Sequence, residues 1–383
     1  MPSAVSRLLP SVGFLIKASI GIAFFTIIAH HVDVASALQR IGRADLWPFL
    51  VATGLILFQH IFAARRWCAV VEGCGHRLPF RVALIAYLEA NFFNQALPST
   101  IGGDAVRLWR SCRAGLPFGP AAVGVLLDRA FGLVVLAALA LIGGAALHAA
   151  PGGKQAGMTL VVAAIVIIAG AVVGGSLSTL CPWLQNWRFS RAAFWLSEGV
   201  RRVMTRPDTA LATIGHSLVG HLITVVAFER LAASLGLSIG LDGALKALPA
   251  LMLVAAIPLS IGGWGMRESA GVAILPILGL ASSEDALALS LLLGLSLLLL
   301  GLLGGVVWLL DDDADLARLR DPRHGTGGEM SLARQELQVA ETSDLAGRGD
   351  DPERGTSALS GALSGRKRAI LAQAENERVM SAS

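Results

Sequence analysis

One ten-residue pattern, P-x-S/T-I-G-G-x-x-x-R, occurs twice in this chain, about 160 residues apart. The first copy, PSTIGGDAVR, spans residues 98–107, and the second, PLSIGGWGMR, spans residues 258–267. Both copies interrupt apolar runs. Proline and paired glycines stop a helix, and the residues that follow can start another. In a bilayer, such a break survives only where the freed backbone groups are buried in protein or face a wet cavity. The pattern therefore predicts two broken helices within a membrane.

The composition also indicates a membrane protein. Hydrophobic residues make up 54% of the 383 residues, charged residues make up only 15%, and the mean hydropathy is +0.66. A spanning helix needs about 20 mostly apolar residues. Six segments meet this requirement: residues 11–29, 46–63, 120–148, 158–180, 209–231 and 285–310. We therefore expect an all-α, polytopic transmembrane helix bundle with about six full spans.

Three further apolar segments lie around the two copies of the pattern. They are too short or too polar for full membrane-spanning helices. They comprise residues 82–97, 243–258 and 264–281. We interpret them as parts of two re-entrant, broken-helix hairpins. The alternative is that they cross as ordinary short helices, which would give about eight or nine spans.

The re-entrant interpretation predicts an inverted repeat. Each half of the membrane domain would run span, span, hairpin, span, with the second half upside down relative to the first. The halves would cover residues 1–150 and 151–310, within a membrane domain of residues 1–310. Architectures of this kind place their binding sites near the middle of the bilayer.

The distribution of Lys and Arg predicts the orientation of the bundle, because basic residues concentrate on the cytoplasmic side. Six spans with a cytoplasmic N-terminus also place the C-terminus in the cytoplasm. The inside positions are then Arg7, Lys17, Arg65, Arg66, Arg77, Arg81, Arg107, Arg110, Arg113, Arg188, Arg191, Arg201, Arg202 and Arg206, and the outside positions are Arg40, Arg43, Lys154 and Lys246. This asymmetry favours the assumed orientation.

The two ends of the chain carry their own signals. No small-residue cleavage site follows the first apolar stretch, so we expect that stretch to be retained as a span. Residues 311–383 hold 10 basic and 14 acidic side chains without a sustained apolar face. We expect this segment to be a polar, mostly disordered cytoplasmic tail that cannot bury a catalytic core.

A segment between two predicted spans has the composition of an interfacial helix. Residues 181–206 combine Trp183, Trp187, Phe194 and Trp195 with five arginines. Such a mixture is typical of a helix that lies along the lipid headgroups. We expect it to anchor the bundle, with the collection of anionic lipid as the weaker alternative.

The cysteines do not indicate a metal centre. Cys68, Cys74 and Cys112, with His76, have a spacing that fits no standard zinc pairing. Cys68, Cys74, Cys112 and Cys181 all fall near basic segment ends that we place in the cytoplasm, so we expect free thiols rather than disulfides.

The residues around the two Gly-Gly pairs suggest an anion site. Asp104 can cap the helix that follows Gly102-Gly103, and unpaired N–H groups at that helix start attract anions. Arg107 adds a planar guanidinium that suits a pair of phosphate oxygens, and Arg267 would do the same from the second break. The alternative is structural: Arg107 would pair with Asp104, and Arg267 with Glu268, to lock the hairpins.

Other ionisable groups lie within apolar stretches. A charge inside the membrane costs free energy, so each of these residues is a candidate functional residue. They are Glu89, Asp128, Arg129, His216, His221, Glu229 and Arg230. Asp128 needs a partner on another helix, and we expect Arg107 or Arg267. The two histidines are five residues apart, which disfavours a shared metal and favours hydrogen bonds between helices. Glu229 and Arg230 lie near a predicted span end and are expected to snorkel.

Three amide side chains lead into the first copy of the pattern: Asn91, Asn94 and Gln95. They can bond a cargo or satisfy the backbone groups that the break leaves free.

Three segments, in this order, resemble one known family: NFFNQALPSTIGGDAVRLWR at residues 91–110, AAVGVLLDRAFGL at 121–133 and AIPLSIGGWGMRESA at 256–270. They look like the flippase-like membrane-domain family, which includes the transmembrane region of lysylphosphatidylglycerol synthases. The likeness covers roughly residues 10–310. It implies that the chain moves or accommodates an anionic lipid, or a lipid-linked sugar, between leaflets.

The resemblance also implies particular site residues. The implied ligand-binding residues are Asp104, Arg107, Asp128, Arg129, Arg267 and Glu268, and the implied backbone breaks are Pro98, Gly102, Gly103, Gly262 and Gly263. The repeated pattern itself adds Pro258 as a further expected break. No catalytic residue and no metal ligand are implied. The soluble aminoacyl-transferring domain of the larger synthases has no counterpart in the acidic tail, so synthesis of lysyl-lipid is not implied.

Together these features favour a transporter over an enzyme. We expect a multi-pass protein of a bacterial inner membrane, with a cradle for an anionic phospholipid or lipid-linked substrate, no cofactor and no nucleic acid partner. Neither Gly-Gly element extends to a nucleotide-binding loop. Two alternatives remain: a membrane-embedded lipid-phosphate transferase with Asp104, Asp128 or Glu268 as base, and a scaffold that gathers lipid-synthesis or glycolipid-synthesis enzymes.

Overall fold

The structure, a computed structural model of the 383-residue chain, describes residues 32–96, 101–181, 191–257 and 262–310, together with Ser19, Thr26 and His30. All of these residues belong to one compact unit, Met1–Arg320. The tail expected at residues 311–383 lies outside the described residues.

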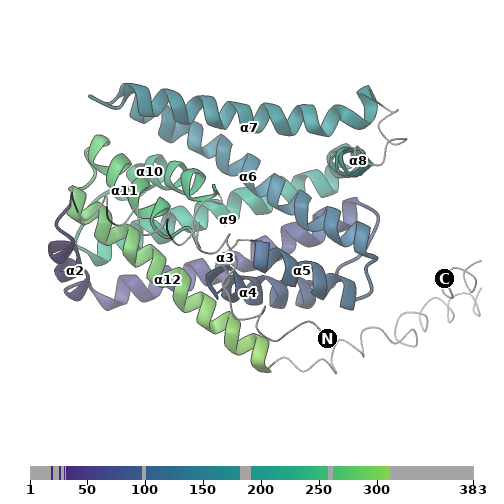
Figure 1. Cartoon of the computed structure of the whole chain (residues 1–383), viewed down its shortest axis with the longest axis horizontal. Helices are drawn as coiled ribbons and strands as arrows, with labels where there is room; N and C mark the ends of the chain where they lie inside the picture. The colour runs from purple at the N-terminus through teal and green to yellow at the C-terminus, as the bar shows by residue number, and fades with distance from the viewer. Residues whose placement is uncertain are drawn as a thin grey trace, which may run out of the picture. The chain divides into compact units, whose positions relative to one another are not determined.

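Helices make up all the regular structure of the described residues, which confirms the all-α fold (Figure 1). In chain order they are α2 (Val34–Gly42), α3 (Leu46–Gly73), α4 (Phe80–Ala96), α5 (Ile101–Arg113), α6 (Phe118–Ala149), α7 (Lys154–Leu180), α8 (Arg191–Thr205), α9 (Pro207–Ser234), α10 (Gly240–Ala255), α11 (Met266–Ile277) and α12 (Ser283–Leu310).

Five helices are long and apolar enough to cross a membrane: α3, α6, α7, α9 and α12. They correspond to five of the six expected spans, and the protein is a polytopic helical bundle. The remaining expected span, residues 11–29, falls almost wholly in the part of the chain that the structure does not describe.

The helices around the repeated pattern are short. α4, α10 and α11 hold 17, 16 and 12 residues. At 1.5 Å per residue, even α4 extends only about 26 Å, less than the roughly 30 Å of a hydrocarbon core. Short helices were expected at these places. Their re-entrant course and the inverted repeat stay predictions.

Helix α3 is longer than its sequence suggests. It continues to Gly73, beyond the expected end at residue 63, so Arg65 and Arg66 lie on the helix and not in a loop. Each has a partner within the bundle: Arg66 bonds Asp128, and the Arg65 guanidinium lies 4.3 Å from the ring centre of Phe80. The expected position of both arginines on the cytoplasmic side stays a prediction.

Small residues bring the helices close together. α12 packs along α4, where a Cβ added to Gly304 would clash with the carbonyl oxygen of Leu88. α6 packs along α10 in the same way, because a Cβ on Gly143 would clash with the carbonyl oxygen of Lys246. α3 packs along α9, whose larger side chains Phe228 and Leu231 are fully buried. Close backbone approach through small residues is the usual way in which membrane helices associate.

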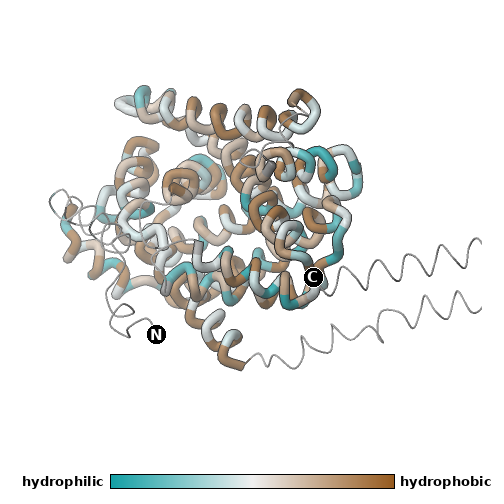
Figure 2. Tube along the Cα trace, turned by 45° about the vertical axis from the view of Figure 1, so that its right-hand side comes forward, coloured by the Kyte–Doolittle hydropathy of each residue, from teal (hydrophilic) through white to brown (hydrophobic). Residues whose placement is uncertain are grey.

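Helix α7 lies at the edge of the bundle, where it packs on α6 and α8 (Figure 1). Large apolar side chains along it are exposed: Met158, Val162, Ile165, Val166, Val172, Val173 and Leu180. Figure 2 shows hydrophobic residues along most of this helix. Such a surface is suited to contact with lipid chains.

Helix α8 connects two of the long helices, α7 and α9, and carries exposed Trp195 beside exposed Arg201 and Arg202. Both arginines donate to Glu198 on the same helix. This arrangement fits the expected interfacial helix. Residues 182–190 of the predicted segment, with Trp183 and Trp187, are not among the described residues.

Candidate functional site

Within the second copy of the pattern, residues 262–265 form a glycine turn before α11. Gly262, Gly263 and Gly265 have φ angles of 57°, 82° and 85°, in the left-handed region that only glycine adopts without strain. The Gly265 N–H donates to Glu268 Oε2 over 2.6 Å, which caps the start of α11. Pro258 lies outside the described residues.

Arg267 follows this turn and is almost fully buried, with 1% of its side chain exposed. Its Nε and Nη2 atoms donate to Glu268 Oε1 over 3.0 and 2.5 Å. Its guanidinium lies 4.8 Å from the ring centre of Trp264. Gly294 on α12 makes room for it, because a Cβ there would clash with Arg267 Nη2. The buried charge is thus neutralised by a neighbouring carboxylate.

The described part of the first copy, residues 101–107, forms the start of α5. Gly102 and Gly103 occupy the first turn of α5, whereas Pro98 falls in the gap between residues 96 and 101. The Gly103 N–H donates to Asn94 Oδ1 over 3.1 Å, and a Cβ on Gly103 would lie 2.5 Å from that oxygen. Asn94 therefore satisfies a backbone group at the start of α5, one of the two roles expected for it.

Arg107 lies one turn into α5 and is buried between two aromatic rings. Its guanidinium carbon is 4.3 Å from the ring centre of Trp67 and 4.2 Å from that of Tyr87. Its Nη2 donates to Asp128 Oδ2 over 2.5 Å. The expected pairing of Asp128 with Arg107 is confirmed. Within the described part of the chain, Arg107 Nε has no hydrogen-bond partner.

Asp128 on α6 joins four helices. Besides Arg107 of α5, it accepts from Arg66 Nε of α3 over 2.7 Å and from the hydroxyl of Tyr87 of α4. The Tyr87 oxygen in turn accepts from Arg66 Nη2 over 3.1 Å. This fully buried carboxylate is surrounded by donors, as a charge in a low-dielectric interior requires.

Two further ion pairs flank this network. Asp104 lies 2.9 Å from Arg129 Nε and 3.6 Å from Arg107 Nη1, so it links α5 to α6. Glu89 of α4 accepts from Arg110 Nε of α5 over 2.8 Å, and both residues are buried. These pairs fix α5 against its neighbours.

A cavity of about 250 Å³ lies between the two breaks. It is lined by Asn91, Asn94 and Gln95 of α4, Met252, Ala255 and Ala256 at the end of α10, Gly262, Gly263, Arg267, and Leu297 of α12. Residues that lead into the first copy of the pattern thus share a cavity with Gly262, Gly263 and Arg267 of the second copy. Among the described residues of this lining, Arg267 carries a charge.

The site residues expected from the sequence fall into two groups. Asp104, Arg107, Asp128 and Arg129 form one network, and Arg267 with Glu268 forms the other. The structural alternative, in which Arg107 pairs with Asp104 and Arg267 with Glu268, is found for both arginines. Their role as ligand-binding residues stays a prediction.

Three residues of the site region were missed from the sequence: His60, Arg66 and Tyr87. His60 Nδ1 donates to the Ile56 carbonyl oxygen over 2.7 Å, and its Nε2 accepts from Asn91 Nδ2 over 2.7 Å. The signal for His60 was present, because it is an ionisable residue within an apolar run. Arg66 was hidden by the expected end of the span, and a single Tyr carries no such signal.

The remaining ionisable suspects lie away from this cavity. His221 Nε2 bonds the Gly132 carbonyl oxygen over 3.0 Å, a link between α9 and α6 of the expected kind. The His216 ring lies 6.2 Å from that of Phe62. Arg230 bonds its neighbour Glu229 near the end of α9. Among the described residues, no cluster of three or more His, Cys, Asp or Glu is arranged to hold a metal ion.

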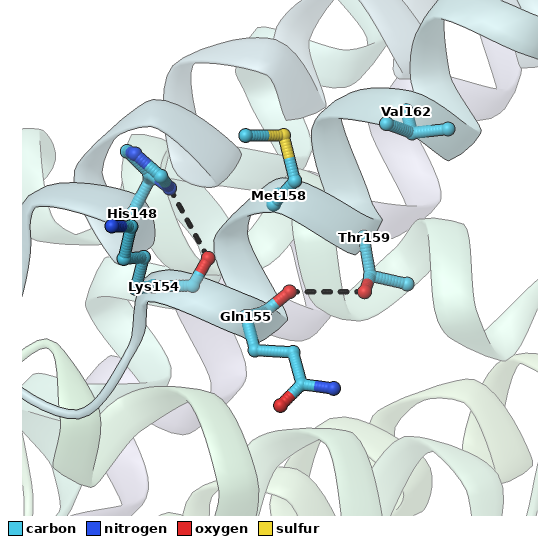
Figure 3. Close-up of a pocket in the computed structure, with 6 residues that line it drawn as sticks. All are labelled: His148, Lys154, Gln155, Met158, Thr159 and Val162. Atoms are coloured by element: carbon cyan, nitrogen blue, oxygen red, sulfur yellow. Dashed lines mark hydrogen bonds between the residues drawn. The ribbon is translucent and has the colours of Figure 1, made fainter.

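Another hollow lies at the turn between α6 and α7 (Figure 3). It is lined by His148, Lys154, Gln155, Met158, Thr159 and Val162. Its polar contacts are local. The His148 ring bonds the Lys154 carbonyl oxygen, and the Thr159 hydroxyl donates to the Gln155 carbonyl oxygen. Most of these side chains are exposed, so this hollow is a weaker candidate than the cavity between the breaks.

Fold and cavity together define a class: a polytopic helical membrane protein with a small cavity whose lining includes three amide side chains and Arg267. The sequence model of the family described as the lysylphosphatidylglycerol synthase TM region matches residues 13–305. The chain therefore belongs to this family, which confirms the resemblance, and it is an integral membrane protein related to lipid handling. None of the curated proteins matches the chain in a sequence search.

Proposed function

We propose that this protein binds the headgroup of an anionic lipid or lipid-linked sugar in the cavity between the breaks and carries it from one leaflet to the other. One observation carries the proposal: a cavity in a bundle of apolar, membrane-spanning helices has three amide side chains and Arg267 in its otherwise apolar lining. Polar groups inside a membrane bundle are costly and mark substrate pathways.

The dimensions of the cavity support a headgroup as the occupant. Its volume of about 250 Å³ is below the 300–1,000 Å³ typical of sites that enclose a whole drug-sized ligand. The acyl chains would stay in the bilayer. The lining would replace hydrogen bonds that the headgroup gives up with water, which lowers the free-energy barrier to crossing the hydrocarbon core.

The proposal is tested by leaflet exchange in vesicles that contain the purified protein. The probe is phosphatidylglycerol with a fluorescent acyl chain, and exchange is the fraction of probe that becomes accessible to a membrane-impermeant quencher. Leu297→Trp adds volume at the cavity wall and should slow exchange at least about tenfold. The matched control is Leu299→Trp on the same helix, where the side chain is 40% exposed, and it should exchange at the wild-type rate.

Other outcomes distinguish the alternatives. The proposal would be contradicted if both variants exchanged the probe at the wild-type rate. It would also be contradicted if the wild type exchanged the probe no faster than protein-free vesicles do. A covalently altered lipid, detected by mass spectrometry of the same vesicles, would identify a transferase. Absence of both activities would favour the scaffold.

We also propose a bacterial inner membrane with both termini in the cytoplasm. The excess of basic residues on the assumed inside supports this orientation. Labelling of single cysteines introduced at position 7 and position 154 with a membrane-impermeant reagent in intact cells tests it. Position 154 should react and position 7 should not.

A further inference from the structure

We infer that the cavity between the breaks recognises hydroxyl groups, so that its ligand is a lipid with a polyol or sugar headgroup. This inference rests on the proposed function for the location of the ligand. It names the chemistry that selects the ligand, which the proposed function leaves open between a charged phosphate and a sugar.

The amide side chains of the lining offer both donors and acceptors. His60 Nδ1 faces a carbonyl oxygen and must carry the proton, so His60 Nε2 accepts from Asn91 Nδ2 and leaves Asn91 Oδ1 as an acceptor. Asn94 Oδ1 is used by the Gly103 N–H, which leaves Asn94 Nδ2 as a donor. Within the described ranges, the Gln95 carboxamide has no hydrogen-bond partner, so it adds a donor and an acceptor.

The charge in the lining is already compensated. The Arg267 guanidinium is held by Glu268 through two hydrogen bonds, and both side chains are buried. A phosphate in this cavity would compete with Glu268 for the guanidinium or would lie close to that carboxylate. Either arrangement buries negative charge without a full counter-charge, which costs more free energy than burial of a neutral group.

Hydroxyl groups match this lining better than phosphate oxygens do. Each hydroxyl donates one hydrogen bond and accepts others, whereas the free oxygens of a phosphodiester only accept. Asn91 Oδ1 therefore finds a partner in a polyol but not in a phosphate. A buried acceptor left without a donor lowers affinity more than a hydrogen bond adds.

Native mass spectrometry of the purified full chain tests the inference with three lipids of identical acyl chains. Monoglucosyl-diacylglycerol carries hydroxyls without phosphate, phosphatidylglycerol carries both, and phosphatidic acid carries phosphate alone. We expect the first two to bind at least about tenfold more tightly than phosphatidic acid. Equal or tighter binding of phosphatidic acid would overturn the inference.

A pair of variants assigns the selectivity to the cavity. Gln95→Leu should lower the affinity for monoglucosyl-diacylglycerol about tenfold and leave that for phosphatidic acid unchanged. Gln155→Leu is the matched control, because Gln155 lies in the hollow of Figure 3, and its carboxamide points away from the other labelled side chains there. An unchanged affinity in Gln95→Leu would place recognition elsewhere and contradict the inference.

The two proposals fail in different ways. Selective binding of hydroxylated lipids without leaflet exchange of any probe would refute the proposed function and leave the inference standing. Equal exchange of fluorescent forms of all three lipids, with equal binding, would support transport and refute the inference.

Discussion

The carboxamide of Gln95 lies against the backbone of Gly262, so close that a Cβ atom at Gly262 would be 2.5 Å from Gln95 Oε1. Gln95 lies in the last turn of α4, before the first break, and Gly262 begins the described part of the second broken element. Residues about 160 positions apart in the chain thus form one wall of the same cavity. The contact makes the proximity of the two breaks testable by substitution.

Gly262→Ala should lower the melting temperature in detergent more than Gly279→Ala does. Both glycines have positive φ angles, 57° and 67°, so both substitutions introduce similar backbone strain. Only the Cβ at position 262 meets another atom within 4 Å. Because Gln95 Oε1 is the end of a flexible side chain, rotation relieves part of the clash, and we expect it to cost less than about 1 kcal/mol.

The double variant Gly262→Ala with Gln95→Ala provides the control for this contact. Removal of the Gln95 side chain should recover most of the difference between the two alanine variants. Equal melting temperatures for Gly262→Ala and Gly279→Ala would contradict a close contact between Gln95 and Gly262.

Asp128→Ala should destabilise the protein strongly, because it leaves Arg66 and Arg107 buried without their shared carboxylate. Loss of one partner from a buried ion pair typically costs about 3–5 kcal/mol. The free energy of unfolding, measured by titration with a denaturing detergent, checks this value. Asp242→Ala removes an exposed ion pair with Lys246. This control substitution should change the free energy of unfolding by less than about 1 kcal/mol.

Gly304→Ala should separate α12 from α4, because the added Cβ clashes with the Leu88 carbonyl oxygen. A clash with the backbone cannot be relieved by side-chain rotation, so we expect a loss of about 1–3 kcal/mol. Gly170→Ala on α7 is the control, since nothing lies within 4 Å of its Cβ. It should leave stability unchanged or raise it by up to about 1 kcal/mol. Equal effects of the two substitutions would contradict the close packing of α12 on α4.

The stability contributed by Glu198 should depend on pH. Hydrogen bonds from Arg201, and then from Arg202, lower the pKa of Glu198 from 4.5 to about 2. A carboxylate with a lowered pKa stabilises the folded state fully above its unfolded pKa and loses this effect as the pH falls toward the folded value. The melting temperature of the wild type should therefore exceed that of Glu198→Gln at pH 7, and the difference should shrink between about pH 4.5 and pH 2.

Salt provides a second check on this pair. Because Arg201 and Arg202 are about half exposed, the difference at pH 7 should also be small and should diminish at 1 M salt. A difference that persists unchanged at pH 2 would contradict the ionic origin.

The spanning helices could be predicted from the sequence because hydrophobic length is a local property. The expected spans at 120–148 and 209–231 differ from the observed Phe118–Ala149 and Pro207–Ser234 by at most three residues at either end. The short helices around the glycine pairs were also recognised, because proline and glycine limit helices locally. The end of α3 was misplaced, since charged residues usually mark the end of a span and the buried partner of Arg66 could not be seen.

The partners of the charged residues could be predicted only in part. The pairs Arg107–Asp104 and Arg267–Glu268 follow from neighbouring positions on one helix, and both were among the alternatives. The contacts of Asp128 with Arg66 and Tyr87 join three helices, and no pattern in a single sequence specifies which faces of those helices meet. The role of Gln95 was open for the same reason.

One buried carboxylate has a mechanical consequence for the whole bundle. Asp128 ties α3, α4, α5 and α6 together, so these four helices should move as a single rigid block. The opposite wall of the cavity includes Gly262 and Gly263, which with Gly265 have left-handed backbone torsions that can change at little cost in free energy. If the proposed transport requires this cavity to change shape, we expect a hinge motion at residues 262–265.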